Sequence, residues 1–202
     1  IIIIPFYTIL GIFLCILSIY IFYFFRDPIR SIPDEDVVVS PADGLVTFIG
    51  ESKSPLESNL DKNNYTKISI FLSIFDVHVN RMPIDASILS INYIPGKFLN
   101  ATLDKSSKAN ERNIIYAKKN EDYFYVVQIA GLIARRIVCN LKNNQVVIKG
   151  ERIGIIKFGS RVDLYLPKNY NILISKGQRV IGGETIISNP NNIKNIKSAV
   201  LK

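Results

Sequence analysis

The sequence has very few of the side chains from which proteins build metal sites and disulfide frameworks. It contains one histidine, His78, and two cysteines, Cys15 and Cys139. Zinc sites take three or four such ligands, so we expect no metal. Cys15 lies in an apolar N-terminal run, which argues against a disulfide with Cys139. We therefore expect both thiols to stay reduced, as in a domain that faces the cytoplasm.

Several common functional motifs are also missing. The chain has no P-loop, no dinucleotide fingerprint and no nucleophile elbow. Its 25 Lys and Arg outnumber its 17 Asp and Glu, for a net charge of +8. Nucleic acid is the generic partner of a basic protein, but the basic residues are scattered and no recognition-helix motif is present. The charge instead favours anionic lipid head groups, and we expect no nucleic acid partner.

Charged residues are absent from 1–25. A helix rises about 1.5 Å per residue, so this run can cross a hydrocarbon core of roughly 30 Å. It is too long for a signal peptide, and no small-residue cleavage site follows it. We predict a transmembrane anchor, with half of a membrane-embedded hairpin as the alternative. Because the sequence starts without Met, we also expect a further piece upstream.

The residues at the end of this run predict its orientation. Tyr20 and Tyr23 come first, and Arg26 and Arg30 follow them. An aromatic belt followed by positive charge places the C-terminal side in the cytoplasm. The predicted location is therefore the cell membrane, with the rest of the chain on its cytoplasmic face.

After a proline-containing linker at 26–36, the pattern is typical of strands. In Lys67–Ile74, the side chains of Ile68, Ile70, Leu72 and Ile74 share one face. Further β-rich runs are Val37–Val39, Leu45–Ile49, Ser87–Ile94, Tyr123–Ile129, Val146–Ile148, Ile153–Phe158, Val162–Leu166, Asn171–Ile174 and Thr185–Ile187. Short strands separated by Gly-containing turns predict a mainly β barrel or sandwich over residues 37–202. Its turns resemble those of the hybrid-motif folds of biotinyl and lipoyl carriers.

Two segments interrupt the strand pattern, and a third is ambiguous. Glu51–Thr66 is polar and is predicted to be a surface loop. Asn100–Arg112 is long and charged, and it fits either a solvated loop or a lid over a site. Leu132–Cys139 is compatible with helix or strand.

Gly159-Ser160 is the first candidate for chemistry, because it lies between two runs rich in β-branched residues. Glycine accepts strained backbone angles, so the chain could bend until the serine hydroxyl reaches its own preceding carbonyl. A break there can convert Ser160 into a pyruvoyl group, a carbonyl cofactor made from the chain itself. A Gly-Ser pair by itself is most often only a turn.

A serine nucleophile needs a base, and the base needs an orienting partner. His78 is the only imidazole in the chain, although a lone histidine at a strand end is usually structural. Asp43 precedes Gly44, and such a pair is usually a turn. A carboxylate beside an imidazole would, however, fix its tautomer and favour its charged form. His78 and Asp43 are therefore the candidate partners of Ser160.

Six segments, read together, carry a resemblance to a known family. They are Phe25-Arg26-Asp27-Pro28, Ser40-Pro41-Ala42-Asp43-Gly44, Phe75-Asp76-Val77-His78-Val79-Asn80-Arg81, Asn110-Glu111-Arg112, Phe158-Gly159-Ser160-Arg161, and Lys176-Gly177-Gln178 with Gly182-Gly183-Glu184-Thr185. In this order and over nearly the whole chain, they resemble phosphatidylserine decarboxylase in its short, single-anchor form.

The resemblance implies a proenzyme that cuts itself between Gly159 and Ser160. The products would be a β chain, 1–159, and an α chain, 160–202, held together as a heterodimer. Ser160 would become the pyruvoyl cofactor, whose carbonyl accepts electrons as phosphatidylserine in the membrane loses carbon dioxide to give phosphatidylethanolamine. By the same resemblance, Asp43 and His78 complete a triad with Ser160, and His78 also assists decarboxylation.

Two positions depart from the longer-form enzymes. Arg81 stands where those enzymes have a second histidine, and Arg161 stands where they have threonine. We expect Arg81 to contact the phosphate or carboxylate of the substrate. Archaetidylserine is an alternative substrate, and a membrane-anchored hybrid-fold binding module or a serine hydrolase is an alternative function. A homodimer through an exposed barrel edge is a further expectation.

Overall fold

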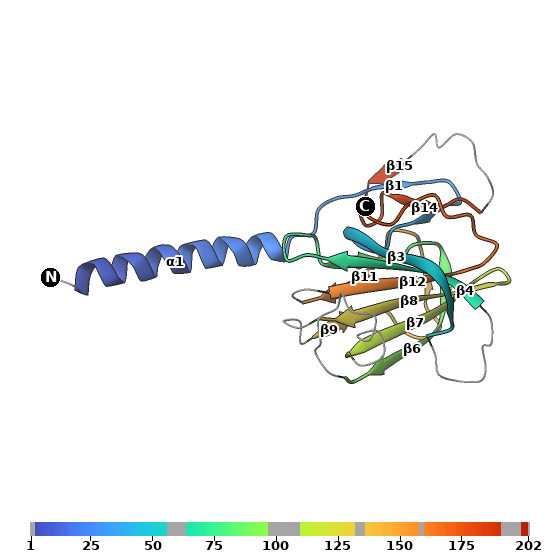
Figure 1. The fold of residues 1–202 in the computed structure, drawn as a ribbon, viewed down its shortest axis with the longest axis horizontal. Helices are drawn as coiled ribbons and strands as arrows, with labels where there is room; N and C mark the ends of the chain where they lie inside the picture. The colour runs from blue at the N-terminus through green and yellow to red at the C-terminus, as the bar shows by residue number, and fades with distance from the viewer. Residues whose placement is uncertain are drawn as a thin grey trace.

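The computed structural model describes residues 3–55, 64–96, 110–131, 136–157, 160–190 and 199–201. Its one described helix, α1 (Ile3–Phe24), projects away from a β domain (Figure 1). The window Tyr7–Phe24 has a mean hydropathy of 2.2 and lies almost wholly outside the protein core. A helix of 22 residues is long enough to cross a bilayer. This exposed apolar helix suggests membrane anchoring.

One sheet dominates the domain and curves as an antiparallel half-barrel. Along the chain its eight strands are β3 (Gly44–Lys53), β4 (Asn64–Leu72), β6 (Ala86–Ile94), β7 (Arg112–Lys119), β8 (Asp122–Ala130), β10 (Val146–Val147), β12 (Ser160–Pro167) and β13 (Arg179–Val180). In space their order is β10-β6-β7-β8-β12-β4-β3-β13. The strand that begins at Ser160 therefore lies in the interior of the sheet.

Three small sheets complete the domain. They are β5 (Val79–Arg81) with β11 (Arg152–Ile156) and β9 (Ile137–Cys139), β2 (Val38–Val39) with β14 (Ile186–Ser188), and β1 (Ser31–Pro33) with β15 (Ala199–Leu201). All their pairings are antiparallel. The predicted fold class, a mainly β domain with one apolar N-terminal helix, is confirmed.

The alternation of apolar side chains places the larger hydrophobic core on one face of the half-barrel, and a smaller cluster that includes Tyr125 and Ile129 is buried on the other. Ile68, Ile70 and Leu72 of β4 are buried in the larger core with alternate residues of β12. Ile74 does not join them. It lies beyond the end of β4 and is 37% exposed, because the chain turns where Asp76 N donates to Ser73 O. The prediction that Ile74 shares a face with Ile68, Ile70 and Leu72 was wrong.

The predicted loops contain strand at their edges. β3 extends to Lys53 and β4 begins at Asn64, so only part of the predicted loop 51–66 joins them, and 56–63 lie outside the described residues. β7 begins at Arg112, the last residue of the other predicted loop. The ambiguous segment contains strand β9, while 132–135 are not described.

The stretch 26–36 lies against the domain. Within it, β1 pairs with β15, so both ends of the domain meet in one small sheet (Figure 1). Arg30 and Ile32 are buried. The division into an anchor at 1–25, a linker at 26–36 and a domain at 37–202 stays a prediction.

Candidate active site

Several strands of the half-barrel end at the same edge of the sheet. Ser160, the first residue of β12, lies opposite Leu72 at the end of β4 and Ala130 at the end of β8. Asp43 immediately precedes β3, which pairs with the other side of β4. Because β4 lies between them, Asp43 and Ser160 are about two strand spacings of 4.8 Å apart.

Gly44 makes this close approach possible. A Cβ at that position would lie 2.2 Å from the carbonyl oxygen of Phe71, and its φ is +151°. Any other residue would therefore push β3 away from β4 beside Asp43. The Asp-Gly pair has a structural reason, whatever the role of Asp43.

The loop after β4 carries His78 to the same edge. Ser73 N donates to Asp76 Oδ2 at 2.8 Å, which closes the turn. His78 O then accepts from Ile156 N at 3.4 Å, at the end of β11. The short connection between β11 and β12 therefore begins beside His78 and ends at Ser160. Gly159, the other half of the predicted cleavage site, lies outside the described residues.

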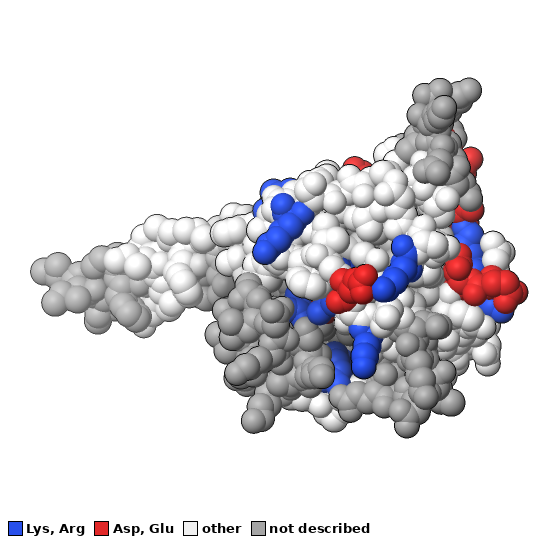
Figure 2. All heavy atoms as spheres, turned by 45° about the vertical axis from the view of Figure 1, so that its right-hand side comes forward, with Lys and Arg blue, Asp and Glu red and all other residues white. Residues whose placement is uncertain are grey.

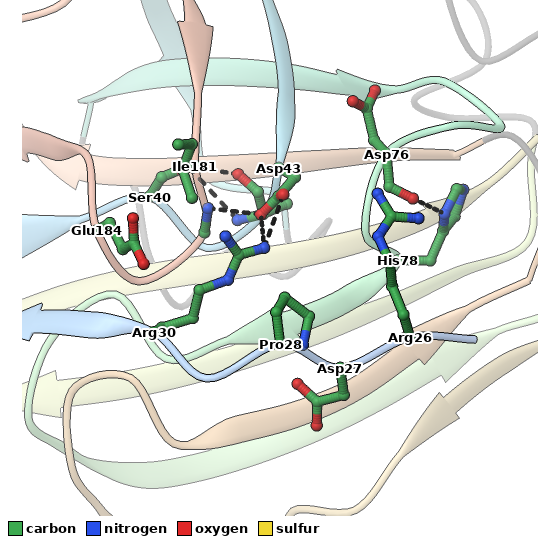
Figure 3. A network of polar contacts seen from close by, with 12 residues as sticks. Arg26, Asp27, Pro28, Arg30, Ser40, Asp43, Asp76, His78, Ile181 and Glu184 are labelled. Atoms are coloured by element: carbon green, nitrogen blue, oxygen red, sulfur yellow. Dashed lines mark hydrogen bonds and ion pairs between the residues drawn. The ribbon is translucent and has the colours of Figure 1, made fainter. Parts of the chain in front are cut away.

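The hydrogen bond of His78 determines which ring nitrogen is free. The ring is fully buried, and Nδ1 lies 2.9 Å from the carbonyl oxygen of Asp76 (Figure 3). A carbonyl only accepts, so Nδ1 carries the proton and Nε2 keeps its lone pair. Burial lowers the pKa of His78 to about 4, although Asp76 opposes this shift. His78 is therefore a neutral imidazole with an available basic nitrogen at pH 7.

Among the buried polar atoms that have no hydrogen-bond partner within the described residues, three lie on β12, β5 and the loop before β5: Ser160 Oγ, Asn80 Nδ2 and His78 Nε2. Buried polar atoms are nearly always paired, so such atoms mark places where another group is to be bound or made. A serine hydroxyl and an imidazole lone pair suit proton transfer from one to the other.

Asn80 is held by a chain of buried amides that the sequence analysis did not identify. Asn113 Nδ2 donates to Gln128 Oε1 at 3.0 Å, and Gln128 Nε2 donates to Asn80 Oδ1 at 2.9 Å. Each amide fixes the orientation of the next, and the last donor, Asn80 Nδ2, remains unused. Gln128 lies opposite Val162, two residues along β12 from Ser160. The only indication in the sequence was Gln128, a polar residue among the apolar residues of β8.

Asp43 is bound to a different partner from the one expected. Arg30 Nη2 donates to both its carboxylate oxygens, at 2.9 and 2.8 Å, and Gly182 N donates to Oδ1 at 2.8 Å (Figure 3). Burial raises the pKa of Asp43, while Gly182 and Arg30 oppose that shift. No hydrogen bond joins it to His78 or Ser160 within the part of the chain described. The orienting contact on His78 comes from the Asp76 carbonyl instead.

Arg81 is only 2% exposed, and its guanidinium is already engaged. Nη1 donates to Gly150 O at 3.0 Å, and Nη2 donates to Asp27 Oδ1 at 2.7 Å and Pro28 O at 3.2 Å. Asp27 also pairs with Arg152. These contacts tie the segment after α1 to the domain, and a substrate contact by Arg81 would require some of them to break.

The face seen in Figure 2 shows no single basic patch, because its blue side chains are scattered and several of them lie beside red ones. Among the described residues, no three His, Cys, Asp or Glu side chains are gathered as metal ligands would be. Within the same residues, Cys15 and Cys139 are free thiols.

Comparison with known proteins agrees with the geometry. The phosphatidylserine decarboxylase family model matches residues 17–188. The phosphatidylserine decarboxylase proenzyme of Ehrlichia chaffeensis is 53% identical over 182 residues, which cover 89% of this chain and 79% of that protein. The chain belongs to the phosphatidylserine decarboxylase family. The phosphatidylserine decarboxylase proenzyme of Pelagibacter ubique is 51% identical over 90% of this chain and 85% of that protein. The proenzyme of Rickettsia typhi is 52% identical over 86% of this chain and 76% of that protein.

The resemblance seen in the six sequence segments is therefore confirmed, and with it the function of a phosphatidylserine decarboxylase proenzyme in lipid biosynthesis. Proenzymes of this family depend on a pyruvoyl group that self-cleavage generates from a serine. Ser160 fits that requirement, since its hydroxyl is buried, unpartnered and at the start of a strand fixed on both sides.

Proposed function

We propose that this phosphatidylserine decarboxylase cuts itself between Gly159 and Ser160, giving the chains 1–159 and 160–202. One observation carries the proposal: Ser160 Oγ and His78 Nε2 are both buried and have no hydrogen-bond partner among the described residues. The backbone of His78 is bonded to Ile156, at the end of β11, from which a short connection leads to Ser160. Asp43, His78 and Ser160 are assigned to the reaction, but with different tasks from those of a hydrogen-bonded triad.

In the first step, His78 Nε2 takes the proton of Ser160 Oγ as the oxygen attacks the carbonyl carbon of Gly159. The amide nitrogen receives that proton and leaves, so an ester replaces the peptide bond. The negative charge that develops on the carbonyl oxygen needs a fixed donor. Asn80 Nδ2 is the donor that the amide chain leaves free for it.

In the second step, a base removes the Cα proton of Ser160 and the carboxylate of Gly159 leaves. Water then hydrolyses the remaining enamine, ammonia departs, and the pyruvoyl group remains at the start of β12. This group supplies an electron sink for the decarboxylation of the lipid. In this proposal His78, whose ring is held by the Asp76 carbonyl, holds a proton at Nε2 and returns it to carbon.

Asp43 acts in this proposal as a positioning residue. Its carboxylate joins Arg30, from the segment after α1, to the backbone of Gly182, from the segment after β13. These contacts hold two segments at the site edge without touching the reacting atoms. Arg81 has a comparable task through Asp27 and Gly150.

We also propose that the domain lies on the cytoplasmic face of the membrane. Support comes from the order of side chains at the end of α1, where Tyr20 and Tyr23 are followed by Arg26. The substrate is a membrane lipid, so an anchored site has only to reach its head group.

The test is the intact mass of the purified membrane protein and of Ser160→Ala. We expect two chains separated after Gly159 in the natural sequence, with the shorter one lacking a free amino terminus, and one uncut chain in the variant. The matched control is Ser69→Ala, which removes the hydroxyl of another buried serine on the adjacent strand β4. This variant should cut normally. Active protein consisting of a single chain would refute the proposal.

A further inference from the structure

The end of the membrane helix is bound to the loop that carries His78. Tyr20 Oη donates to Ile74 O at 3.2 Å, and Tyr23 Oη donates to Phe75 O at 3.3 Å. Arg26, just after the helix, donates from Nη2 to Phe75 O at 2.8 Å. Three side chains thus hold two successive carbonyls of a six-residue loop, close before the imidazole. A simple tether would need none of these contacts.

The last residue of α1 reaches the imidazole itself. The ring centroids of Phe24 and His78 are 4.2 Å apart, with 35° between their planes. Phe24 is fully buried, and it is the only buried residue among the side chains described for α1. Phe22, two residues earlier, is 81% exposed. One aromatic residue of an otherwise lipid-facing helix therefore belongs to the interior of the domain.

We propose that the last turn of α1 is a wall of the active site, and that Phe24 is a positioning residue that holds the His78 ring in place and excludes water from it. The inference rests on the proposed role of His78 as the base. It makes the membrane helix part of the catalytic apparatus as well as an anchor, because moving the helix end would move or wet the imidazole.

The charged groups around His78 do not by themselves account for its neutral state. Asp76, on the same loop, favours the charged ring, and Arg26 opposes it. Arg179 of β13 pairs with Asp76, and Lys157, after β11, lies 5.9 Å from the centre of the Phe25 ring. Burial is the largest cause of the lowered pKa. Phe24 supplies part of that burial, so losing its ring should raise the pKa while the charges stay in place.

The experiment measures the rate of self-cleavage of newly made full-length protein in membranes between pH 5 and 8. Phe24→Ala should slow cleavage about tenfold at pH 5.5 and less than about twofold at pH 8, if the His78 pKa returns toward its ordinary value. Phe24→Leu, which keeps an apolar side chain of similar bulk, should restore most of the rate at pH 5.5. Phe22→Ala removes the same ring from the exposed face and should match the natural sequence at every pH.

Two results would overturn the inference. One is a Phe24→Ala variant that cleaves at the rate of the natural sequence at every pH. The other is an equal loss at all pH values, which would make Phe24 a purely structural residue. Phe24→Leu decides the matter if Phe24→Ala does not fold, since it should then show the same acid-side loss to a smaller degree. Failure of the proposed cleavage itself would appear separately, as an uncut chain in the natural sequence.

Discussion

At the scale of single residues, one backbone carbonyl and burial keep His78 neutral, as its proposed role as a base requires. The Asp76 carbonyl accepts a hydrogen bond from the protonated Nδ1, which leaves Nε2 as the proton acceptor. Arg81, at the position where the resemblance led us to expect a second histidine, donates to Gly150 and Asp27. His78 is the only histidine in the sequence, so the proposed mechanism assigns one imidazole to both the cut and the decarboxylation.

The buried state of His78 makes stability depend on pH. Its folded pKa of about 4 lies below the ordinary 6.5, so the unfolded chain binds more protons between these values and stability falls as pH drops through that window. In the uncut Ser160→Ala protein, lowering pH from 7 to 4.5 should cost about 2–3 kcal/mol from this group. Adding His78→Gln should remove that part of the loss in denaturant unfolding. An unchanged pH dependence would contradict the assignment.

Substitutions at Asp43 and Arg30 test whether Asp43 acts through Arg30 or directly on His78. Asp43→Asn should destabilise the protein by about 3 kcal/mol, because it leaves the Arg30 charge buried without its partner, and should slow self-cleavage. If Asp43 acts through its ion pair with Arg30, Arg30→Gln should slow cleavage to a similar degree. The double variant should then cleave no more slowly than either single variant. Normal cleavage by Arg30→Gln would instead support a direct contact with His78. The measurement is the cleavage rate of all three variants.

At the scale of elements, the amide chain across β7, β8 and β5 leaves Asn80 Nδ2, two residues from His78, without an acceptor among the described residues. If Asn80 Nδ2 stabilises the oxyanion, Asn80→Ala should slow self-cleavage by about 10²-fold. Asn92→Ala, a partly buried amide of β6 bonded to Ser90, is the control and should cut at the natural rate. Cleavage of Asn80→Ala at the natural rate would exclude this role.

The elements also show what the sequence could and could not predict. The alternation in β4 was long enough to identify both the strand and its buried face, except at Ile74, where a turn intervenes. β5 and β9 have three residues each, too few for a periodic pattern. The pairing of Arg81 with Asp27 joins positions 54 apart, and no local pattern encodes it. Phe24 was one apolar residue among many in the N-terminal run, so its contact with His78 could only be found in three dimensions.

At the scale of the whole molecule, the predicted cut divides the sheet between two chains. The chain 160–202 would supply β12, which pairs over eight positions with β4 and over six with β8, both from 1–159. It would also supply β13, β14 and β15, each paired with a strand of the other chain. The two products share one core, and a homodimer beyond this pair stays a prediction.

This arrangement predicts that the cut chains do not separate without global unfolding. Native mass spectrometry in mild detergent should show the two chains as one particle, while a denaturing gel shows two bands. Urea should release the shorter chain only at the concentration that unfolds the sheet, since β12 has no free edge. Release of that chain at lower urea would show that β12 is held more weakly than its pairings indicate.

The interior position of β12 also affects how the enzyme is supplied and lost in the cell. A cofactor formed at the first residue of a central strand needs no uptake, no loading step and no exchange, so activity would follow translation and maturation alone. The same attachment prevents repair. If the carbonyl is reduced or converted to an amine, no fresh copy can replace it, and that molecule stays inactive until it is degraded. The turnover of this enzyme in the membrane would then be limited by chemical damage at a single residue.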